Sequence, residues 1–402
     1  MIDNIASLVN SDARLVNRGR FVDTTFMIAI DDAHTLLRVQ DGRVTEVVQG
    51  PFITPNYSFC LGLAECLGEI LAATAATRLH RYFRTGEAET HAGRRRPASI
   101  HGQPALFQRR HRCPATGGQT MTPHYETITG RYLRCDLLGQ PHRLYVEEAG
   151  QGIPMLCMHT AGADTRQYRG LLNDKRITNN FRVITFDMPW HGKTSPPAGW
   201  QDREYQLTAP DYVRLILDVI DALELEKPIV MGCSIGGRIV LHLAHQHPDR
   251  FRALIGLESA PYAEAYYDLS WLNRPDVHGG MVCAGVISGL IAPTVAATER
   301  WETLWHYMQS GPGVFKGDLY FYTTPDGDIR DRLDQIDVKR CPLFLLTGEY
   351  DYSCTAEAML DIAKRTGAPA TIMKGLGHFP MSEDSEKFVT YLLPVLEKIR
   401  AL

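Results

Sequence analysis

A serine stands between two glycines at the point where an apolar, β-prone run gives way to apolar residues at helical spacing. The run ends at Val230, Ser234 occupies the centre of a G-x-S-x-G pattern, and helical spacing follows over residues 238–244. This order predicts a strand, a sharp turn and a helix, with Ser234 at positive φ and its glycine neighbours leaving room for the turn. We expect the Ser234 hydroxyl to be a nucleophile, and the N–H groups that begin the helix to stabilise an oxyanion.

A carboxylate and a histidine follow this serine, each at the end of a predicted strand. Asp351 comes shortly after the apolar run 342–347, and His378 comes shortly after the run 370–373. A serine hydroxyl becomes a good nucleophile only when a base takes its proton, and an imidazole base needs a carboxylate to fix its tautomer and stabilise its charge. We therefore expect Ser234, His378 and Asp351 to form a catalytic triad.

Two other carboxylates remain alternatives for the acid of the triad. Glu349 is the nearer alternative, two positions before Asp351. Glu258 is more distant in the sequence and ends an earlier predicted strand.

The second part of the chain alternates apolar strands with helices, which predicts a parallel sheet covered by helices on both faces. The predicted strands are residues 131–138, 142–148, 154–158, 182–186, 228–230, 253–257, 342–347 and 370–373. The predicted helices include residues 167–172, 210–225, 356–365 and 384–402.

With the serine elbow, the segment 348–351 and the Gly-His segment 375–380 in this order, residues 121–402 resemble an α/β-hydrolase. The resemblance implies a mostly parallel sheet with helices on both faces and a helical cap inserted at about residues 260–337. It also implies the triad order nucleophile, acid, histidine, and no cofactor. A serine at the elbow separates the chain from the members of this family that use an aspartate nucleophile.

The resemblance places an oxyanion hole at the backbone N–H groups of Ile235 and Ala161. The family usually has His-Gly where this chain has His159-Thr160. We expect Thr160 either to narrow the hole or to add a hydroxyl donor.

The predicted cap is rich in aromatic residues, most of which we expect to pack the cap onto the core. A few are expected to line an apolar pocket over Ser234, which favours a substrate with an aromatic or medium-length acyl part. The candidate pocket residues are Thr160, Trp271, Trp301, Trp305 and Tyr307.

These residues predict a hydrolase of a small apolar or aromatic carboxylic ester or lactone that works through an acyl-enzyme. The first alternative is hydrolysis of a carbon–carbon bond in a meta-cleavage product of aromatic catabolism, which α/β-hydrolases with similar caps perform. A thioester is the third option. An alternative from another class is a lipid or acyl carrier, or a scaffold, with a vestigial hydrolase unit.

The first 85 residues are predicted to form a separate small α+β unit. The unit has a helix over 5–16, strands near 21–30, 36–40 and 43–48, and a helix over 57–73, with a tight hairpin turn at Asp41-Gly42. The segments RGRFVDTTF (18–26), RVQDG (38–42) and GPF (50–52) resemble the front half of SCP2-like, sterol-carrier-like domains. The resemblance implies an apolar cavity that binds a lipid or acyl chain.

Residues 86–120 carry the basic runs 94–96 and 109–112 among Pro, Gly and His, with no amphipathic period. We interpret them as a flexible linker. An alternative hypothesis is that a frameshift joined a truncated carrier-like gene to its neighbour, with Met121 as a natural start.

The overall charge and the cysteines exclude several classes of function. A net charge of −4 gives no basis for a nucleic-acid partner. Nine scattered cysteines without a C-x-x-C pair are typical of a reducing cytoplasm, and no Cys/His spacing indicates a metal. The apolar stretch 279–297 contains several glycines and Pro293, so we expect a buried helix there and no membrane span.

Overall fold

The computed structural model describes residues 4–20, 24–30, 33–50, 60–61, 123–263, 269–274 and 278–402. The chain divides into two compact units. One comprises residues 1–8, 23–40 and 44–126, and the other comprises 9–22, 41–43 and 127–402. The proposed linker, 86–120, lies outside the described residues.

The described residues between 4 and 61 form two short helices and a small sheet with the strand order β3-β2-β1-β4. The elements are α1 (Ile5–Ser11), α2 (Ala13–Gly19), β1 (Thr24–Ile30), β2 (Ala33–Gln40), β3 (Arg43–Gln49) and β4 (Cys60–Leu61). Asp41 and Gly42 have φ of 50° and 73°, which confirms the predicted hairpin turn between β2 and β3. The sequence predicts a helix over residues 57–73, but Cys60 and Leu61 form the strand β4, which pairs in parallel with β1, so the prediction is wrong there. The rest of that range lies outside the described residues.

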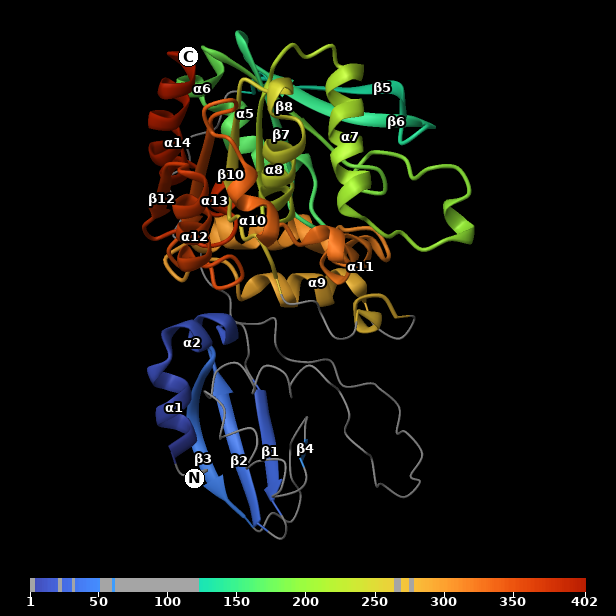
Figure 1. Cartoon of the computed structure of the whole chain (residues 1–402). Coiled ribbons are helices and arrows are strands. Elements are labelled where there is room, and N and C mark those ends of the chain that lie inside the picture. Colours follow the sequence, from blue (N-terminus) through green and yellow to red (C-terminus); the bar gives the residue numbers. More distant parts are fainter. Residues whose placement is uncertain are drawn as a thin grey trace. The chain divides into compact units, whose positions relative to one another are not determined.

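The larger unit is built on an eight-stranded sheet (Figure 1). Its strands are β5 (Thr129–Leu137), β6 (Gln140–Ala149), β7 (Ile153–Met158), β8 (Phe181–Phe186), β9 (Ile229–Cys233), β10 (Ala253–Leu257), β11 (Leu343–Gly348) and β12 (Ala370–Met373). The order is β12-β11-β10-β9-β7-β8-β6-β5. Strand β6 pairs antiparallel with both of its neighbours, β5 and β8, and the other neighbouring pairs of this sheet are parallel. The predicted mostly parallel sheet is therefore confirmed.

Helices cover both faces of this sheet because its strands are apolar on both sides. Successive residues of a strand point to opposite faces, so Met231 belongs to one buried cluster and Val230 to the other. The first cluster includes residues of α5 (Arg169–Asn173), α6 (Lys175–Thr178) and α14 (Ser385–Arg400). The second includes residues of α7 (Ala209–Ala222), α8 (Ile235–Gln246) and α12 (Ala356–Thr366).

The segment between β10 and β11 contains the helices of the region that the sequence predicts to be a cap, and we refer to it as the cap. It contains α9 (Gly279–Ser288), α10 (Ala297–Met308) and α11 (Val314–Leu319), of which α9 and α10 pack against each other. In the apolar stretch 279–297, α9 ends at Ser288 and α10 begins only at Ala297. Within the described residues no helix has the length and hydropathy needed to cross a bilayer. The remaining short helices are η3 (Thr165–Tyr168), η4 (Trp200–Asp202), η5 (Pro248–Arg250), η6 (Ser270–Leu272), η7 (Tyr320–Thr323), η8 (Pro325–Gly327), η9 (Arg330–Gln335) and α13 (Pro380–Glu383).

The carboxyl ends of four adjacent parallel strands bring chemistry-bearing residues to one edge of the sheet. His159 follows β7, Ser234 follows β9, Glu258 follows β10, and Glu349 follows β11. Ligand sites of open α/β sheets lie at this edge, so the fold positions the candidate site there.

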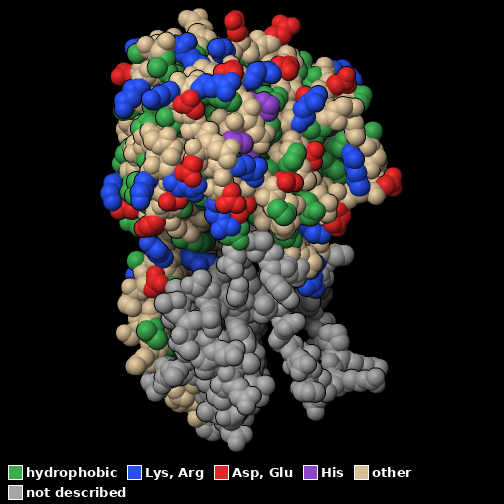
Figure 2. All heavy atoms as spheres, viewed as in Figure 1, with side chains coloured by type: hydrophobic (Ala, Val, Ile, Leu, Met, Phe, Trp, Pro, Cys, Tyr) green, Lys and Arg blue, Asp and Glu red, His purple; other side chains and the backbone are tan. Residues whose placement is uncertain are grey.

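The outer surface of the larger unit carries charges of both signs. On the face seen in Figure 2, Lys and Arg side chains are interspersed with Asp and Glu, and neither sign gathers into one patch. This distribution agrees with the small net charge of the sequence.

Candidate active site

Ser234 occupies a strained turn between β9 and α8. Its φ is 61° and its ψ is −114°, and its N–H donates to the carbonyl of Leu257 on the adjacent strand β10 (3.0 Å). A Cβ atom on Gly232 would overlap the backbone of Gly236, so the turn tolerates no side chain at Gly232. The predicted strand–turn–helix around Ser234 is therefore present, with the serine as the N-cap of α8.

The imidazole of His378 is hydrogen-bonded to the carboxylate of Asp351. The distance from His378 Nδ1 to Asp351 Oδ2 is 2.6 Å, and both side chains are buried. The N–H groups of Ser353 and Cys354 donate to the other carboxylate oxygen, Oδ1 (2.7 and 3.1 Å). Burial alone would raise the pKa of Asp351, but His378 and the hydrogen-bond donors outweigh it and hold the pKa below its usual value.

The loop that carries His378 is anchored beside the serine. The thiol of Cys233, next to Ser234, donates to the carbonyl of His378 (3.3 Å), and the N–H of His378 donates to the carbonyl of Leu290 (3.0 Å). Among the described residues no hydrogen bond is formed by the hydroxyl of Ser234 itself. Hydrogen bonds between nucleophile and base are often long in free enzymes and tighten with substrate.

The two alternative acids occupy different environments. The carboxylate of Glu349 is bound on the surface by the Lys374 ammonium (3.0 Å) and the N–H of Gly375 (2.9 Å), which hold it away from His378. Glu258 is fully buried at the end of β10 and accepts hydrogen bonds from the N–H of Gly348. Glu258 therefore lies in the interior with Asp351, whereas Glu349 does not.

A second buried glutamate, Glu383, fixes the residue before His378. Its carboxylate accepts hydrogen bonds from the N–H groups of Gly377 and of Ala292, the latter at 3.2 Å. Burial raises the pKa of Glu383 to about 7. The sequence carries no signal for this residue, because the sequence pattern of α13 resembles that of any polar helix start.

In the loop after β7, the backbone N–H groups on either side of Ala161 are bound by side chains. The N–H of Thr160 donates to Gln167 Oε1 (3.0 Å), and the N–H of Gly162 donates to Asp318 Oδ2 (2.7 Å). Within the described residues, neither the N–H of Ala161 nor that of Ile235 donates to another group. These are the two N–H groups that the sequence predicts for the oxyanion hole.

The start of α8 and the loop after β7 are in contact. A Cβ on Gly236 would lie 3.3 Å from the carbonyl oxygen of Met158 and 3.6 Å from that of His159. The two candidate oxyanion donors, Ile235 and Ala161, therefore come from neighbouring backbone segments.

The Thr160 hydroxyl is already engaged in a closed ring of hydrogen bonds. Tyr307 OH binds Thr160 Oγ1, Thr160 Oγ1 donates to Gln167 Oε1 (3.2 Å), and Gln167 Nε2 donates to Tyr307 OH (3.0 Å). The expectation that Thr160 adds a hydroxyl donor to the hole is therefore not met in this structure. Its hydroxyl instead connects the loop to α10 of the cap.

A second connection between this loop and the cap runs through Asp318 of α11. Its carboxylate accepts hydrogen bonds from Tyr205 OH (2.7 Å) and His191 Nε2 (2.8 Å) in addition to the N–H of Gly162. The other ring nitrogen of His191 faces the carbonyl of Pro189 (3.0 Å). Burial would lower the pKa of His191, but Asp318 outweighs it and the pKa is raised, so His191 binds Asp318 as part of this connection.

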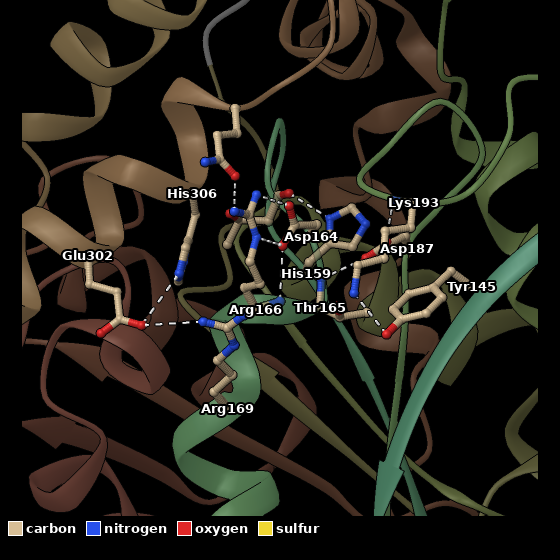
Figure 3. Close-up of polar contacts among 12 residues, drawn as sticks. Tyr145, His159, Asp164, Thr165, Arg166, Arg169, Asp187, Lys193, Glu302 and His306 are labelled. Atoms are coloured by element: carbon tan, nitrogen blue, oxygen red, sulfur yellow. Dashed lines mark hydrogen bonds and ion pairs between the residues drawn. The ribbon is translucent and has the colours of Figure 1, made fainter. Parts of the chain in front are cut away.

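Further polar contacts hold the loop after β7 against the segment after β8, and several of their residues are drawn in Figure 3. The carboxylate of Asp187 accepts from the N–H groups of Thr165 (2.8 Å) and Lys193 (2.7 Å), and burial raises its pKa to about 6. His159 accepts from the N–H of Met188 at Nε2 (3.1 Å), and burial lowers its pKa to about 4. A neutral His159 therefore donates from Nδ1 to the carbonyl of Thr160 (2.9 Å) and fixes the loop.

The predicted pocket residues are divided by the structure. Tyr307 is fully buried and packs against Phe379, with ring centroids 5.4 Å apart. Trp301 and Trp305 expose 60% and 57% of their surface, so the prediction that they line an apolar pocket over Ser234 is corrected. Trp271 lies in η6, and its side chain is outside the described residues.

One group of side chains brings metal-type ligand atoms together in the described part of the chain. Donor atoms of Asp351, Cys354 and His378 lie within 4.8 Å of one another, and all three residues are buried. The hydrogen bond between His378 and Asp351 already occupies two of these atoms, so we assign them to acid–base chemistry.

Comparisons with known proteins identify the family. The family model described as the alpha/beta hydrolase fold matches residues 153–276. The chain is 30% identical over 275 residues to the 2-hydroxymuconate semialdehyde hydrolase of Pseudomonas putida, with 66% of this chain and 95% of that protein covered. The chain belongs to the α/β-hydrolase family. This hydrolase is also 31% identical over 268 residues to the zearalenone hydrolase of Cladophialophora bantiana, with 63% and 92% covered.

Other matches are shorter or show the fold alone. This hydrolase spans 42% and 40% of the length of the first two curated relatives that it matches. A solved esterase of Thermogutta terrifontis superimposes with a TM-score of 0.57 at 18% identity, over 67% of this chain and 99% of that one. The matches give no support to an SCP2-like domain in residues 1–85.

Proposed function

We propose that this α/β-hydrolase is a serine hydrolase of carboxylic esters or lactones that works through an acyl-enzyme. Ser234 is the nucleophile, His378 the base and Asp351 the acid. The observation that carries the proposal is the buried 2.6 Å hydrogen bond between His378 and Asp351, on a loop anchored to the residue beside a strained Ser234. This combination has the parts that nucleophilic acyl transfer requires.

The reaction begins when Ser234 Oγ attacks the carbonyl carbon and His378 Nε2 takes the hydroxyl proton. Asp351 remains ionised and stabilises the imidazolium through Nδ1. His378 then returns the proton to the leaving alcohol, and the acyl-enzyme remains. Water, deprotonated by His378, attacks the acyl-enzyme and releases the acid.

The N–H groups of Ile235 and Ala161 bind the oxyanion of each tetrahedral intermediate. Both are unpaired within the described residues, whereas the flanking N–H groups of Thr160 and Gly162 are bound by side chains. A preorganised donor of this kind contributes about 3 kcal/mol to transition-state stabilisation. The fixed loop supplies this donor without reorganisation.

An apolar or aromatic acyl part is favoured by the aromatic rings behind the base. Phe379 packs edge-on against His378 (4.9 Å between centroids) and also contacts Tyr307. These rings form an apolar wall next to the base, which suits an aromatic or medium-length acyl group.

Hydrolysis of a carbon–carbon bond in a meta-cleavage product is the second candidate. It is favoured by the similarity along 95% of a 2-hydroxymuconate semialdehyde hydrolase. The same Ser234 and His378 would act, with His378 first assisting the ketonisation of the dienol. Thioester hydrolysis is the third option and uses the same residues.

A substrate panel on the full-length protein tests these candidates. Wild type and Ser234→Ala are offered p-nitrophenyl esters of increasing chain length, a thioester and a meta-cleavage dienone. Ser234-dependent turnover of the esters without loss of the dienone supports the ester proposal. Bleaching of the dienone with weak ester turnover favours carbon–carbon hydrolysis. Unchanged turnover in Ser234→Ala rejects the serine mechanism.

Two further predictions do not depend on the serine mechanism. One is a carrier or scaffold role for the chain, and the other is the binding of an acyl chain by residues 1–85. A fluorescent fatty acid titrated against full-length Ser234→Ala measures such binding without turnover. Saturable binding supports a carrier role, and no binding contradicts it.

A further inference from the structure

Two buried carboxyl groups stand behind the imidazole of His378. Asp351 lies on the loop after β11, and Glu258 ends the adjacent parallel strand β10. Both are buried, and in the described part of the chain neither forms an ion pair with Lys or Arg. Two ionised carboxylates in such a place would repel each other strongly, so the pair must hold a proton.

Glu258 is held against Asp351 by the backbone. Both of its oxygens face the N–H of Gly348 (2.9 and 3.0 Å), and the N–H of Asp351 donates to the carbonyl of the same Gly348 (3.2 Å), so both acidic residues lie beside this glycine. The residue has a φ of 49°, a left-handed conformation that is rare for Glu. Strain of this kind persists only where the surrounding structure over-determines it, and it clusters at functional sites.

The hydrogen bonds around the pair decide which group carries the proton. Asp351 receives donors from His378, Ser353 and Cys354, all of which favour its ionised form. Glu258 receives one backbone N–H, which its two oxygens share. A hydrogen bond between two carboxyl groups needs a proton on one of them, and this arrangement leaves it on Glu258.

We propose that Glu258 is a positioning residue of the active site: it is neutral, and it donates its carboxyl proton to Asp351. The donation holds Asp351 in the orientation that directs Oδ2 to His378 Nδ1. It also disperses part of the Asp351 charge, which sets how strongly the carboxylate stabilises the imidazolium. This inference rests on the proposed serine-hydrolase function.

The other titratable groups near Glu258 agree with a neutral carboxyl group. Burial and the neighbouring Asp351 raise the pKa of Glu258 well above its usual value. Burial also raises the thiol pKa values of Cys233 and Cys354 well above the usual value, so both thiols stay uncharged. Glu383 interacts electrostatically with both carboxyl groups, and burial raises its pKa to about 7. A negative charge on Glu258 would be repelled by an ionised Glu383 as well as by Asp351.

The test compares variants of the full-length enzyme in kcat/KM against pH with a p-nitrophenyl ester. Glu258→Gln is the decisive variant, because its amide N–H can donate to Asp351 while its carbonyl accepts from Gly348. We expect it to keep activity within about threefold of wild type with an unchanged pH profile, whereas Asp351→Asn loses about a thousandfold or more. Glu349→Gln, on the surface of the neighbouring loop, is the matched control and is expected to behave as wild type.

Glu258→Leu removes both the donor and the acceptor. We expect a loss of about tenfold or more in kcat/KM and an upward shift of the acidic limb, because an uncompensated Asp351 stabilises the protonated imidazole more strongly. Thermal unfolding shows whether the variant is folded. If Glu258→Leu is unfolded, the comparison of Glu258→Gln with Asp351→Asn decides whether the inference holds.

Two results would overturn the inference. If Glu258→Gln is as damaging as Asp351→Asn, Glu258 is ionised and serves His378 directly. If folded Glu258→Leu keeps the wild-type pH profile, the residue is only structural. Neither result affects the serine mechanism, which fails separately if Ser234→Ala retains turnover.

Discussion

The hydroxyl group of Tyr307, on the cap helix α10, is hydrogen-bonded to the hydroxyl group of Thr160, on the loop that carries the N–H of Ala161. Gln167 closes the ring between them. The residue before the candidate oxyanion donor Ala161 is therefore held by a side chain that is 147 positions away from it in the sequence. Helix α10 thus helps to fix the conformation of the loop after β7.

Tyr307→Phe tests this connection. The variant removes one hydroxyl group from the ring, so the loop loses a restraint and kcat/KM is expected to fall about tenfold, mainly through kcat. Tyr212→Phe is the matched control, because the Tyr212 hydroxyl is buried without a hydrogen-bond partner in the described residues. We expect no loss of activity in the control, and equal activity of the two variants would contradict the role given to Tyr307.

Asp318→Asn tests the second connection between cap and loop. The variant leaves the buried His191 without its counter-charge and is expected to lower the free energy of unfolding by about 3 kcal/mol. Urea unfolding at neutral pH measures this change. Asp334→Asn, which breaks an exposed ion pair with Arg365, is expected to leave the urea midpoint unchanged. A small effect at Asp318 would show that His191 is neutral.

Glu383 gives a prediction about stability and pH. Its folded pKa is about 7, above the ordinary value of 4.5, so the folded state holds an extra proton between these pH values. The stability contributed by protonated Glu383 is complete at the acid end and falls as the pH rises through this window. The difference in free energy of unfolding between wild type and Glu383→Gln should change by about 3 kcal/mol across it, with wild type relatively more stable at low pH.

Urea unfolding at several pH values measures this difference for Glu383. Glu357→Gln is a control for which the pH dependence of the stability difference has the opposite sign, because local hydrogen bonds lower the pKa of Glu357. A pH-independent difference between wild type and Glu383→Gln would show that Glu383 titrates normally.

Gly232→Ala tests the serine turn itself. The added Cβ overlaps the backbone of Gly236, so Ser234 is displaced and kcat/KM is expected to fall about a hundredfold. Gly285→Ala in α9 adds a Cβ that meets no other atom of the described residues. We expect that control to keep full activity and to gain about 0.5–1 kcal/mol of stability.

The sequence predicts the sheet well, and it supplies candidates for a triad, because both depend on local patterns. Apolar runs such as β7 and β11 have the length and composition of buried parallel strands, and the residues that follow their ends meet by topology alone. Ser234 and His378 are recognised from short segments in which glycine spacing reports backbone geometry.

The residues that sequence reasoning missed act at long range. Asp318 and Glu383 bind backbone N–H groups 156 and 91 positions away, and Gln167 binds a hydroxyl group 140 positions away. Nothing in their own neighbourhoods distinguishes the three from polar surface residues. The prediction that the tryptophans of α10 line the pocket is wrong for a related reason. Trp301 and Trp305 share one face of α10 and Tyr307 lies on another, so which face is buried depends on packing against α9 and the core.

The hydrogen-bond ring of Thr160, Gln167 and Tyr307 has a consequence for protein engineering. A cap transplanted from a relative to change substrate preference would bring its own residue to the place of Tyr307. Thr160 and Gln167 would then face an unmatched partner, and the Ala161 N–H would lose its support. Cap and loop are therefore one exchangeable module, and a chimera should carry residues 159–167 together with its cap.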